Sequence, residues 1–287
     1  MYRILLVVFV FFLHIPEGLM AELICRPVVN VYIDPKEDTE IDSQALYGDV
    51  VEIVEQKSGW SKITMVDGIT GWVLSSQVIS NPSYEKSRNL RPLKSLFAHI
   101  YRVKDTIPYP PLLTIPYGTK VKLDKTVDTG ERWVSIELLS GEKAWIQRGD
   151  IDFAPKHKTL EEVLIFSKSF LGIPYTWGGR SSYGYDCSGF VQMLFREMGL
   201  HIPRNSGDQA KCGLFIPVER EDLQPGDLLF FGTKKITHVG IYLGNGQFIH
   251  SGVKERPMVM ISSLETGKYP FKTARRINRS MIASYQS

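Results

Sequence analysis

The 287-residue sequence has only three cysteines, Cys25, Cys187 and Cys212, and it contains no CxxC pair of the kind that structural zinc sites use. It also has no run of roughly 20 apolar residues, the length that a membrane-spanning helix requires. The formal charge of +3 is too weak for the basic stripe of a nucleic-acid-binding protein. With 43% hydrophobic and 11% aromatic residues, the composition is that of an ordinary globular protein rather than a disordered chain.

The first 21 residues have the features of a secretory signal peptide. Arg3 precedes the apolar run 4–13, turn-forming residues follow at 16–18, and we expect cleavage after Ala21. The protein is then expected in the periplasm or cell envelope, without stable insertion in the membrane. A retained anchor and initiation at Met20 are the alternatives. Because three cysteines cannot all pair within one chain, at least one thiol is expected to be free.

The rest of the chain divides into three units. Residues 22–80 and 93–155 are rich in β-branched and aromatic residues punctuated by glycine turns, which predicts two small β-barrels. Residues 81–92 are predicted to be the linker between them. From residue 156 to 287 the pattern changes to mixed helix and strand, which predicts a separate α+β unit.

Four tryptophans repeat across the two barrel regions. Trp60 and Trp72 are twelve residues apart, as are Trp133 and Trp145, and this indicates an internal duplication. In domains of about 60 residues we expect such rings to fill the core. Both stretches resemble bacterial SH3-type domains.

The α+β unit has clear helix boundaries. Thr159 and Glu162 form a capping box ahead of apolar residues with helical spacing. A second helix is expected from Cys187 to Met198, where Gly199 ends it. Strands are expected at residues 228–231, 238–243 and 247–250.

Cys187 lies in the first turn of the second predicted helix, in the run Asp186-Cys187-Ser188-Gly189-Phe190. The unpaired amides and the dipole at a helix N-terminus favour an anion, which lowers the pKa of a thiol and provides donors for an oxyanion. A structural cysteine seldom has glycine and serine around it at a helix start. We therefore predict that Cys187 is a nucleophile held as a thiolate.

His238 and His250 lie on two predicted strands joined by a glycine turn. A two-residue turn would pair His250 with Ile241 and place the two histidines on opposite faces. A three-residue loop with a bulge at Gly246 would instead pair His250 with Gly240 and place both histidines on one face. The hydrophobic pattern favours the second register.

Cys187, His238 and His250 together have the residue types of a nucleophile, a general base and a polar residue that orients the base. A zinc site made of the same three residues is the competing interpretation. Their spacing matches no closed zinc motif, so no metal is predicted.

Five motifs follow one another between residues 158 and 262. They are Tyr175-Thr176-Trp177-Gly178-Gly179, Asp186-Cys187-Ser188-Gly189-Phe190, Pro203-Arg204-Asn205-Ser206, Leu223-Gln224-Pro225-Gly226-Asp227-Leu228 and His238-Val239-Gly240-Ile241-Tyr242. These motifs resemble the NlpC-type cell-wall cysteine peptidases. The resemblance implies a compact papain-like α+β catalytic domain after the two SH3-like barrels, with Cys187 as nucleophile, His238 as base, His250 as orienting residue and Tyr175 as active-site tyrosine.

Two barrels and the loop 180–185 resemble the subgroup that cuts γ-D-glutamyl-diaminopimelate bonds in stem peptides with a free N-terminal L-alanine. In that subgroup the acidic residue before the nucleophile and nearby serines hold the substrate amine, which implies Asp186, Ser188 and Ser206. A barrel residue is expected to close the cleft, and Trp72 is the candidate.

The implied partners are peptidoglycan stem peptides or muropeptides, with no nucleic acid and no cofactor, and the protein is expected to be a monomer. An N-acetylmuramoyl-L-alanine amidase would use the same triad. A catalytically silent wall-binding protein is the alternative from another class, but the intact Cys187, His238 and His250 argue against it.

Overall fold

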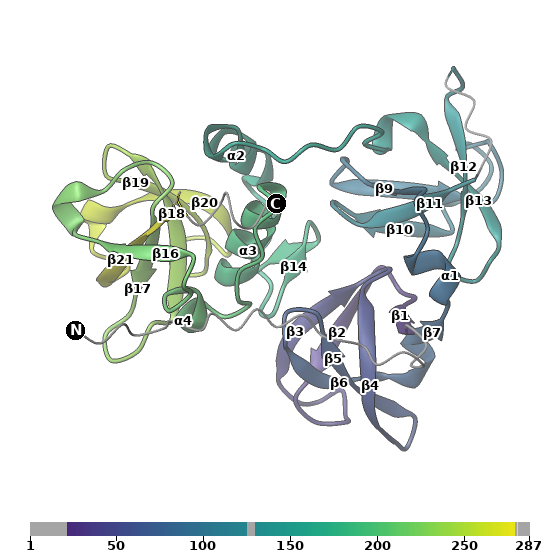
Figure 1. The fold of residues 1–287 in the computed structure, drawn as a ribbon, viewed down its shortest axis with the longest axis horizontal. Coiled ribbons are helices and arrows are strands. Elements are labelled where there is room, and N and C mark those ends of the chain that lie inside the picture. Colours follow the sequence, from purple (N-terminus) through teal and green to yellow (C-terminus); the bar gives the residue numbers. More distant parts are fainter. Residues whose placement is uncertain (1–21, 125–129, 279, 281–287) are drawn as a thin grey trace, which may run out of the picture.

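The computed structural model describes residues 22–124, 130–278 and 280. Figure 1 shows two β-structured units on the right and a mixed unit on the left, with a short hairpin around β14 between them. The predicted signal peptide, residues 1–21, lies outside the described residues. Among the described residues, no helix has the length and apolar character needed to span a bilayer.

The first unit is a seven-stranded sheet in the order β3-β2-β6-β5-β4-β1-β7. Its strands are β1 (Glu22–Ile24), β2 (Val28–Tyr32), β3 (Ile41–Leu46), β4 (Val50–Lys57), β5 (Trp60–Met65), β6 (Thr70–Leu74) and β7 (Val78–Ser80), with the 3-10 turn η1 (Ser75–Gln77) before β7. Alternate residues of a strand point to opposite faces, and Val29, Val31 and Ile63 accordingly lie in the buried core.

The second unit is a six-stranded sheet in the order β10-β9-β13-β12-β11-β8. It contains β8 (Leu90–Pro92), β9 (Phe97–Tyr101), β10 (Leu113–Pro116), β11 (Lys120–Leu123), β12 (Trp133–Glu137), β13 (Lys143–Gln147) and η2 (Arg148–Asp150). The predicted linker 81–92 needs correction, because it holds the short helix α1 (Pro82–Glu85) and ends in β8, which pairs with β11. Asn81 accounts for the helix start, since its side chain accepts the N–H of Tyr84.

The two sheets share one hairpin geometry, as the duplicated tryptophan spacing suggests. In β5–β6 Trp60 pairs with Leu74, and in β12–β13 Trp133 pairs with Gln147, so each tryptophan faces the residue fourteen positions later. Gly68 and Gly141 turn the chain between these strands at φ values of 84° and 83°, a backbone region that glycine adopts without strain.

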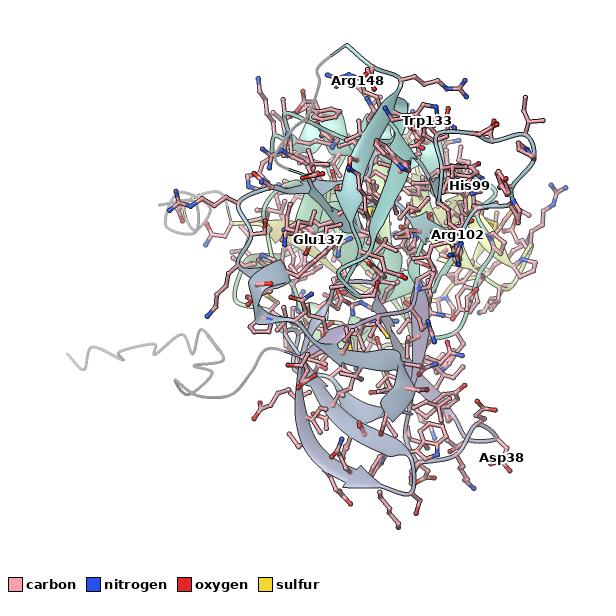
Figure 2. The ribbon with its side chains drawn as sticks, turned by 90° about the vertical axis from the view of Figure 1, so that its right-hand side faces the viewer. Asp38, His99, Arg102, Trp133, Glu137 and Arg148 are labelled. Carbon is pink, nitrogen blue, oxygen red and sulfur yellow. The ribbon has the colours of Figure 1, made fainter. Side chains whose placement is uncertain are left out.

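Three of the four repeated tryptophans are not core residues, contrary to the expectation, whereas Trp72 is buried as expected. Trp60, Trp133 and Trp145 are half-buried, and no tryptophan belongs to a buried cluster of the described chain. Figure 2 shows Trp133 and His99 on the outer side of the second sheet. Cations cover two of these rings, with Lys104 Nζ 4.5 Å from the centroid of Trp145 and the Arg132 guanidinium 5.5 Å from that of Trp133. The rings therefore support long basic side chains instead of filling the interior.

The third unit contains the helices α2 (Leu160–Ser167), α3 (Cys187–Glu197) and α4 (Ser206–Gln209) beside a six-stranded sheet ordered β16-β21-β17-β18-β19-β20. The strands are β16 (Phe215–Val218), β17 (Leu228–Phe231), β18 (His238–Gly244), β19 (Gln247–Gly252), β20 (Met258–Ser263) and β21 (Phe271–Ile277). A separate hairpin joins β14 (Arg180–Ser181) to β15 (Gly184–Tyr185), and 3-10 turns occur at η3 (Lys168–Phe170), η4 (Arg220–Asp222) and η5 (Leu264–Thr266).

The helix starts follow the sequence signals. The Thr159 hydroxyl accepts the Glu162 N–H at 3.2 Å, and the Glu162 carboxylate accepts the Thr159 N–H at 2.7 Å, which is the predicted capping box. Phe190, Leu194 and Phe195 of α3 are buried in the cluster that also contains Val239 and Ile249. The apolar face of α3 thus packs on β18 and β19 and carries Cys187 to their edge.

Candidate active site

Cys187 is the first residue of α3, and its backbone neighbours fix the helix start. Asp186 is the N-cap, with extended φ and ψ of −85° and 178°, and its Oδ1 accepts the N–H of Gly189 at 2.7 Å. A side chain at Gly189 would overlap the carbonyl oxygen of Gly179. Only glycine at this position lets the helix start pack directly on the glycine-rich loop, which explains the small residues around the thiol.

The hairpin of the two histidines has the predicted register but reaches it differently. Ile241 pairs with Ile249, which places Gly240 opposite His250. The turn is nevertheless the two-residue type, because Asn245 and Gly246 both have positive φ, 51° and 70°. The extra residue is Leu243, where the register shifts between Tyr242 and Gly244. The bulge predicted at Gly246 was therefore wrong, although the facing of the two histidines was predicted correctly.

The two imidazoles and a serine form a chain of hydrogen bonds. His238 Nε2 lies 2.8 Å from His250 Nδ1, and His250 Nε2 lies 3.0 Å from Ser262 Oγ. Because Nε2 of His238 is occupied by His250, Nδ1 is its free ring nitrogen. The backbone N–H of Val239, the next residue along β18, is directed at the Cys187 sulfur. This contact places the thiol beside the strand end that carries His238.

Burial dominates the electrostatics of these residues. It raises the pKa of the Cys187 thiol to about 12, with the Asp186 carboxylate adding to the effect and the N–H of Val239 opposing it. Burial, then His250 and Lys254, hold the pKa of His238 well below its ordinary value. Burial alone lowers the pKa of His250 to about 3. Burial therefore disfavours the charged forms of both the Cys187 thiol and the His238 imidazole, which opposes the predicted resting thiolate.

Asp186 has a partner that the sequence analysis did not assign. The buried Arg204 guanidinium forms an ion pair with both Asp186 oxygens and donates from Nη1 to Ser188 Oγ at 2.9 Å. Its Nε donates to Ser43 Oγ of β3 at 3.1 Å. The Asp186 carboxylate thus already has a cationic partner, and its role in holding the substrate amine stays a prediction.

Of the other predicted site residues, Tyr175 and Ser206 belong to the catalytic unit and Trp72 belongs to the first barrel. Tyr175 is half-buried, and burial, followed by the proximity of Cys187 and Asp186, raises the pKa of its phenol. Ser206 begins α4, two residues after Arg204. Trp72 is only 6% exposed in β6, where Lys62 Nζ lies 5.8 Å from its ring centroid, so it offers little surface to a substrate.

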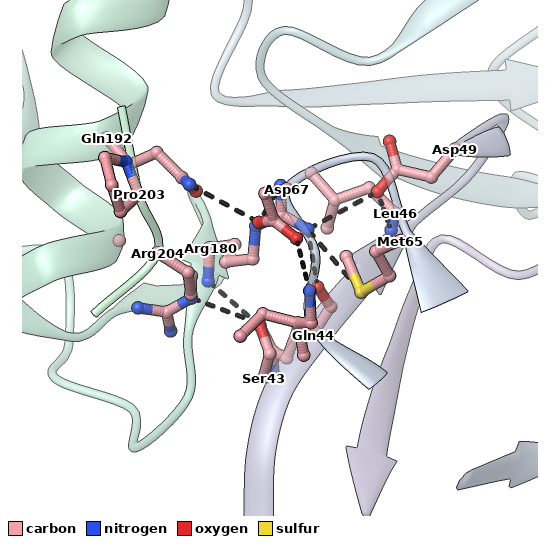
Figure 3. A network of polar contacts seen from close by, with 12 residues as sticks. Ser43, Gln44, Leu46, Asp49, Met65, Asp67, Arg180, Gln192, Pro203 and Arg204 are labelled. Atoms are coloured by element: carbon pink, nitrogen blue, oxygen red, sulfur yellow. Dashed lines mark hydrogen bonds and ion pairs between the residues drawn. The ribbon is translucent and has the colours of Figure 1, made fainter. Parts of the chain in front are cut away.

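A different part of the first barrel contacts the catalytic unit. Figure 3 shows the network, in which Arg180 donates to the Gln44 carbonyl and lies 3.4 Å from Asp67 and 3.7 Å from Asp49. Gln192 of α3 donates to the Asp67 carboxylate at 3.3 Å. These contacts come from β3 and from the turns after β3 and β5. They fix this face of the barrel beside the start of the nucleophile helix.

Among the described residues, no group of three or more histidine, cysteine or acidic side chains is arranged to hold a metal ion. All three thiols are unpaired, with Cys187 buried and Cys25 and Cys212 half-buried.

Comparison with known proteins relates this arrangement to a family. The sequence model described as NlpC/P60 family matches residues 172–277, and the one described as bacterial dipeptidyl-peptidase Sh3 domain matches residues 31–78. A relative from Bacillus cereus named gamma-D-glutamyl-L-lysine dipeptidyl-peptidase is 30% identical over 247 residues, which cover 77% of this chain and 70% of the relative. The chain belongs to the NlpC/P60 family. The predicted family and the α+β fold with an N-terminal SH3-type domain are thereby confirmed.

Other NlpC/P60 relatives agree with this placement. A protein of the same name from Bacillus subtilis is 29% identical over 80% of this chain and 78% of its own length. A crystal structure of an NlpC/P60 family protein from Bacillus cereus superposes with a TM-score of 0.76 at 26% identity, covering 90% of this chain and 99% of the other. The SH3 match is confined to residues 31–78, so the SH3 character of the second sheet stays a prediction.

Proposed function

We propose that this NlpC/P60 protein is a cysteine endopeptidase of peptidoglycan, which cleaves the bond between γ-D-glutamate and the diamino acid of stem peptides. The hydrogen bond between His238 and His250, with the Val239 N–H on the Cys187 sulfur, is the observation that carries the proposal. Two relatives that span most of the chain are named for γ-D-glutamyl-L-lysine peptidase activity, which supports the choice of bond.

The chemistry follows from the free ring nitrogen of His238. Nδ1 takes the thiol proton as the Cys187 sulfur attacks the γ-carbonyl carbon, and backbone N–H groups at the start of α3 are placed to stabilise the oxyanion. The imidazolium then returns its proton to the leaving amine of the diamino acid, which leaves a thioester. Water, deprotonated by His238, releases the glutamyl product and restores the thiol. His250 accepts from Nε2–H of His238 throughout, which keeps Nδ1 free to act as base.

Defined peptides test the reaction. We expect the purified protein to convert L-Ala-γ-D-Glu-L-Lys and the meso-diaminopimelate form to L-Ala-D-Glu and the free diamino acid, measured by mass spectrometry. Cys187→Ala should abolish the product. Cys212→Ala, which removes a half-buried thiol outside the site, is the matched control and should leave the rate unchanged.

Two other outcomes would replace the proposal. Release of the whole peptide from a muramoyl-linked substrate would identify an N-acetylmuramoyl-L-alanine amidase. Binding to intact wall without any Cys187-dependent product would identify a silent wall-binding protein. The comparison of lysine and diaminopimelate peptides also decides the third-position residue, for which the motif resemblance and the names of the relatives point to different diamino acids.

We further propose that the substrate carries a free N-terminal L-alanine whose ammonium meets a carboxylate, either at the start of α3 or on the first barrel. Asp186, with Ser188 and Ser206, is one candidate group, but its charge is shared with Arg204. Asp42 is the extra residue of a β-bulge in β3, a feature that re-aims a side chain. Burial raises the pKa of this half-buried carboxyl while Arg204 opposes the shift, so an ammonium would stabilise its charged form.

Substrates with and without the amine separate these candidates. A charge-assisted contact is worth about 1.5–3 kcal/mol, so N-acetylation should lower kcat/KM by roughly ten- to a hundredfold. Asp42→Asn should reduce the rate on the free amine but not on the N-acetyl peptide. Asp38→Asn, on the exposed side of the same barrel, is the control (Figure 2). Equal rates on both substrates would refute the amine requirement.

Export to the periplasm or cell envelope, and a monomeric state, are part of the same proposal. Export is supported by the apolar run 4–13 and the expected cleavage after Ala21, and the monomeric state stays a prediction. The protein recovered from the envelope fraction should have an N-terminal sequence that begins at Glu22. Recovery of the full-length chain from the cytoplasm would contradict export.

A further inference from the structure

The imidazole of His238 is enclosed by aromatic rings that the proposed reaction has not yet used. Its closest neighbour is Tyr269, from the loop between η5 and β21, whose ring centroid lies 4.6 Å away at an interplanar angle of 21°. His250 meets it edge-on at 4.9 Å and 86°. Phe231 of β17 lies 5.7 Å away. One face of the base is therefore covered by a parallel ring, while its edge is held by a hydrogen bond.

Tyr269 is itself held by several contacts. It is 7% exposed, and its hydroxyl accepts the N–H of Lys254 at 3.3 Å. The Lys254 ammonium lies 5.0 Å from the same ring centroid and donates to the Lys268 carbonyl at 2.6 Å. A Cβ at Gly252 would lie 2.5 Å from the Tyr269 hydroxyl and would overlap the His250 ring. The missing side chain at Gly252 thus allows the phenol and His250 to approach each other.

We propose that Tyr269 is a positioning residue for the base of the proposed reaction: its stacked ring fixes the plane of the His238 imidazole so that Nδ1 faces Cys187. The last torsion of a histidine side chain has a broad energy profile, so the hydrogen bond to His250 at one ring atom does not define the plane alone. Rotation of the imidazole out of its present plane would drive its edge into the Tyr269 ring. Offset stacking at this separation is also attractive.

The neighbouring charged groups and the stacked Tyr269 ring have opposite effects on the charged form of His238. His250 from β19 and Lys254 both disfavour the imidazolium of His238, while Glu255 and Cys187 act on the stacked Tyr269. The face of a tyrosine ring attracts a cation, so Tyr269 stabilises the imidazolium that forms during attack while it also holds the Lys254 ammonium. The stack is therefore suited to a base that is neutral at rest and charged only during the reaction.

The proposal rests on the proposed function, and its test includes a readout that needs no substrate. In Tyr269→Leu we expect kcat on the cleaved peptide to fall by about tenfold or more with KM within about twofold, because a misplaced base slows the chemical step rather than binding. Alkylation of Cys187 by iodoacetamide at pH 7, followed by peptide mass spectrometry to exclude Cys25 and Cys212, should slow by a similar factor. Tyr269→Phe restores the stacked ring and should recover most of both rates.

Phe271→Leu is the matched control for lost packing. Phe271 packs against the same aromatic cluster, and its ring lies 6.3 Å from that of Phe231 and 5.5 Å from the Arg220 guanidinium. The Phe271→Leu substitution should lower the melting temperature about as much as Tyr269→Leu but leave kcat and the alkylation rate near wild type. Equal loss of both rates in the two variants, or unchanged rates in Tyr269→Leu, would overturn the positioning role.

Histidine nitrogen chemical shifts complete the test. In the wild type we expect His238 as the Nε2–H tautomer, and in Tyr269→Leu a mixture of tautomers. A single, unchanged tautomer in the variant would overturn the proposal. Slower alkylation in Tyr269→Leu, in a protein that cuts no wall peptide, would instead refute the proposed function while leaving the positioning role intact.

Discussion

Replacing Arg204 tests the central ionic contact of the site. The guanidinium is 2% exposed, pairs with both oxygens of Asp186, and also donates to Ser188 and Ser43. Removing one partner of a buried ion pair leaves an uncompensated charge and costs about 3–5 kcal/mol. For a chain of this size that corresponds to a fall in melting temperature of roughly 6–20 °C. We expect Arg204→Met to show this loss by calorimetry, together with reduced cleavage.

Two further variants show whether the charge is responsible. Asp186→Asn combined with Arg204→Met removes both charges, so the double variant should be more stable than the sum of the single losses implies. Ser43→Ala removes a single hydrogen bond to a charged group and should cost about 1.5–3 kcal/mol at most. A melting temperature for Arg204→Met within about 2 °C of wild type would refute the reasoning, because the carboxylate would then find another partner or reach water.

Three other predictions concern the thiol and the histidines. Because burial holds the pKa of Cys187 at about 12, thiolate absorbance at 240 nm between pH 5 and 9 should be the same in wild type and Cys187→Ala; an excess of one thiolate in wild type at pH 7 would contradict this. The pKa of His250 is lowered to about 3, so the folded state binds fewer protons than the unfolded state, and its contribution to stability, present above about pH 6.5, is lost as the pH falls toward 3. His250 alone should contribute up to about 1.4 kcal/mol per pH unit to the slope in urea titrations, and His250→Asn should reduce the slope while the share of His238 remains. Gly252→Ala should lower kcat by about tenfold or more, because the added methyl overlaps the His250 ring; a rate within twofold of wild type would contradict the tight packing.

Local sequence signals predicted the parts of the fold that depend on neighbouring residues. The capping box at Thr159 and the glycine after Met198 mark the two helices, because a cap acts within a few residues. The apolar alternation also placed His238 and His250 on one face. The bulge was misplaced because the pattern records which face a residue occupies and not where the extra residue is accommodated.

Contacts between distant segments could not be predicted in this way. Arg204 lies in one of the five family motifs, yet nothing in its spacing indicates that it pairs with Asp186, eighteen residues earlier. The raised pKa of Cys187 has the same origin, since the helix start predicts a lowered value and only the packed barrel and sheet remove the water. Tyr269 stands alone in the loop before β21, where no periodicity relates it to His238.

The hairpin before the nucleophile explains how both barrels influence the site. At one end, Arg180 is bound to the first barrel through Gln44 and Asp67. At its tip, Ser182 accepts the N–H of Tyr117 at 3.0 Å and donates to the Leu96 carbonyl, which attaches the same loop to the second sheet. The hairpin ends at Tyr185, two residues before Cys187. A displacement of either barrel would therefore move the start of α3, so the second barrel is coupled to the thiol through the backbone of this hairpin.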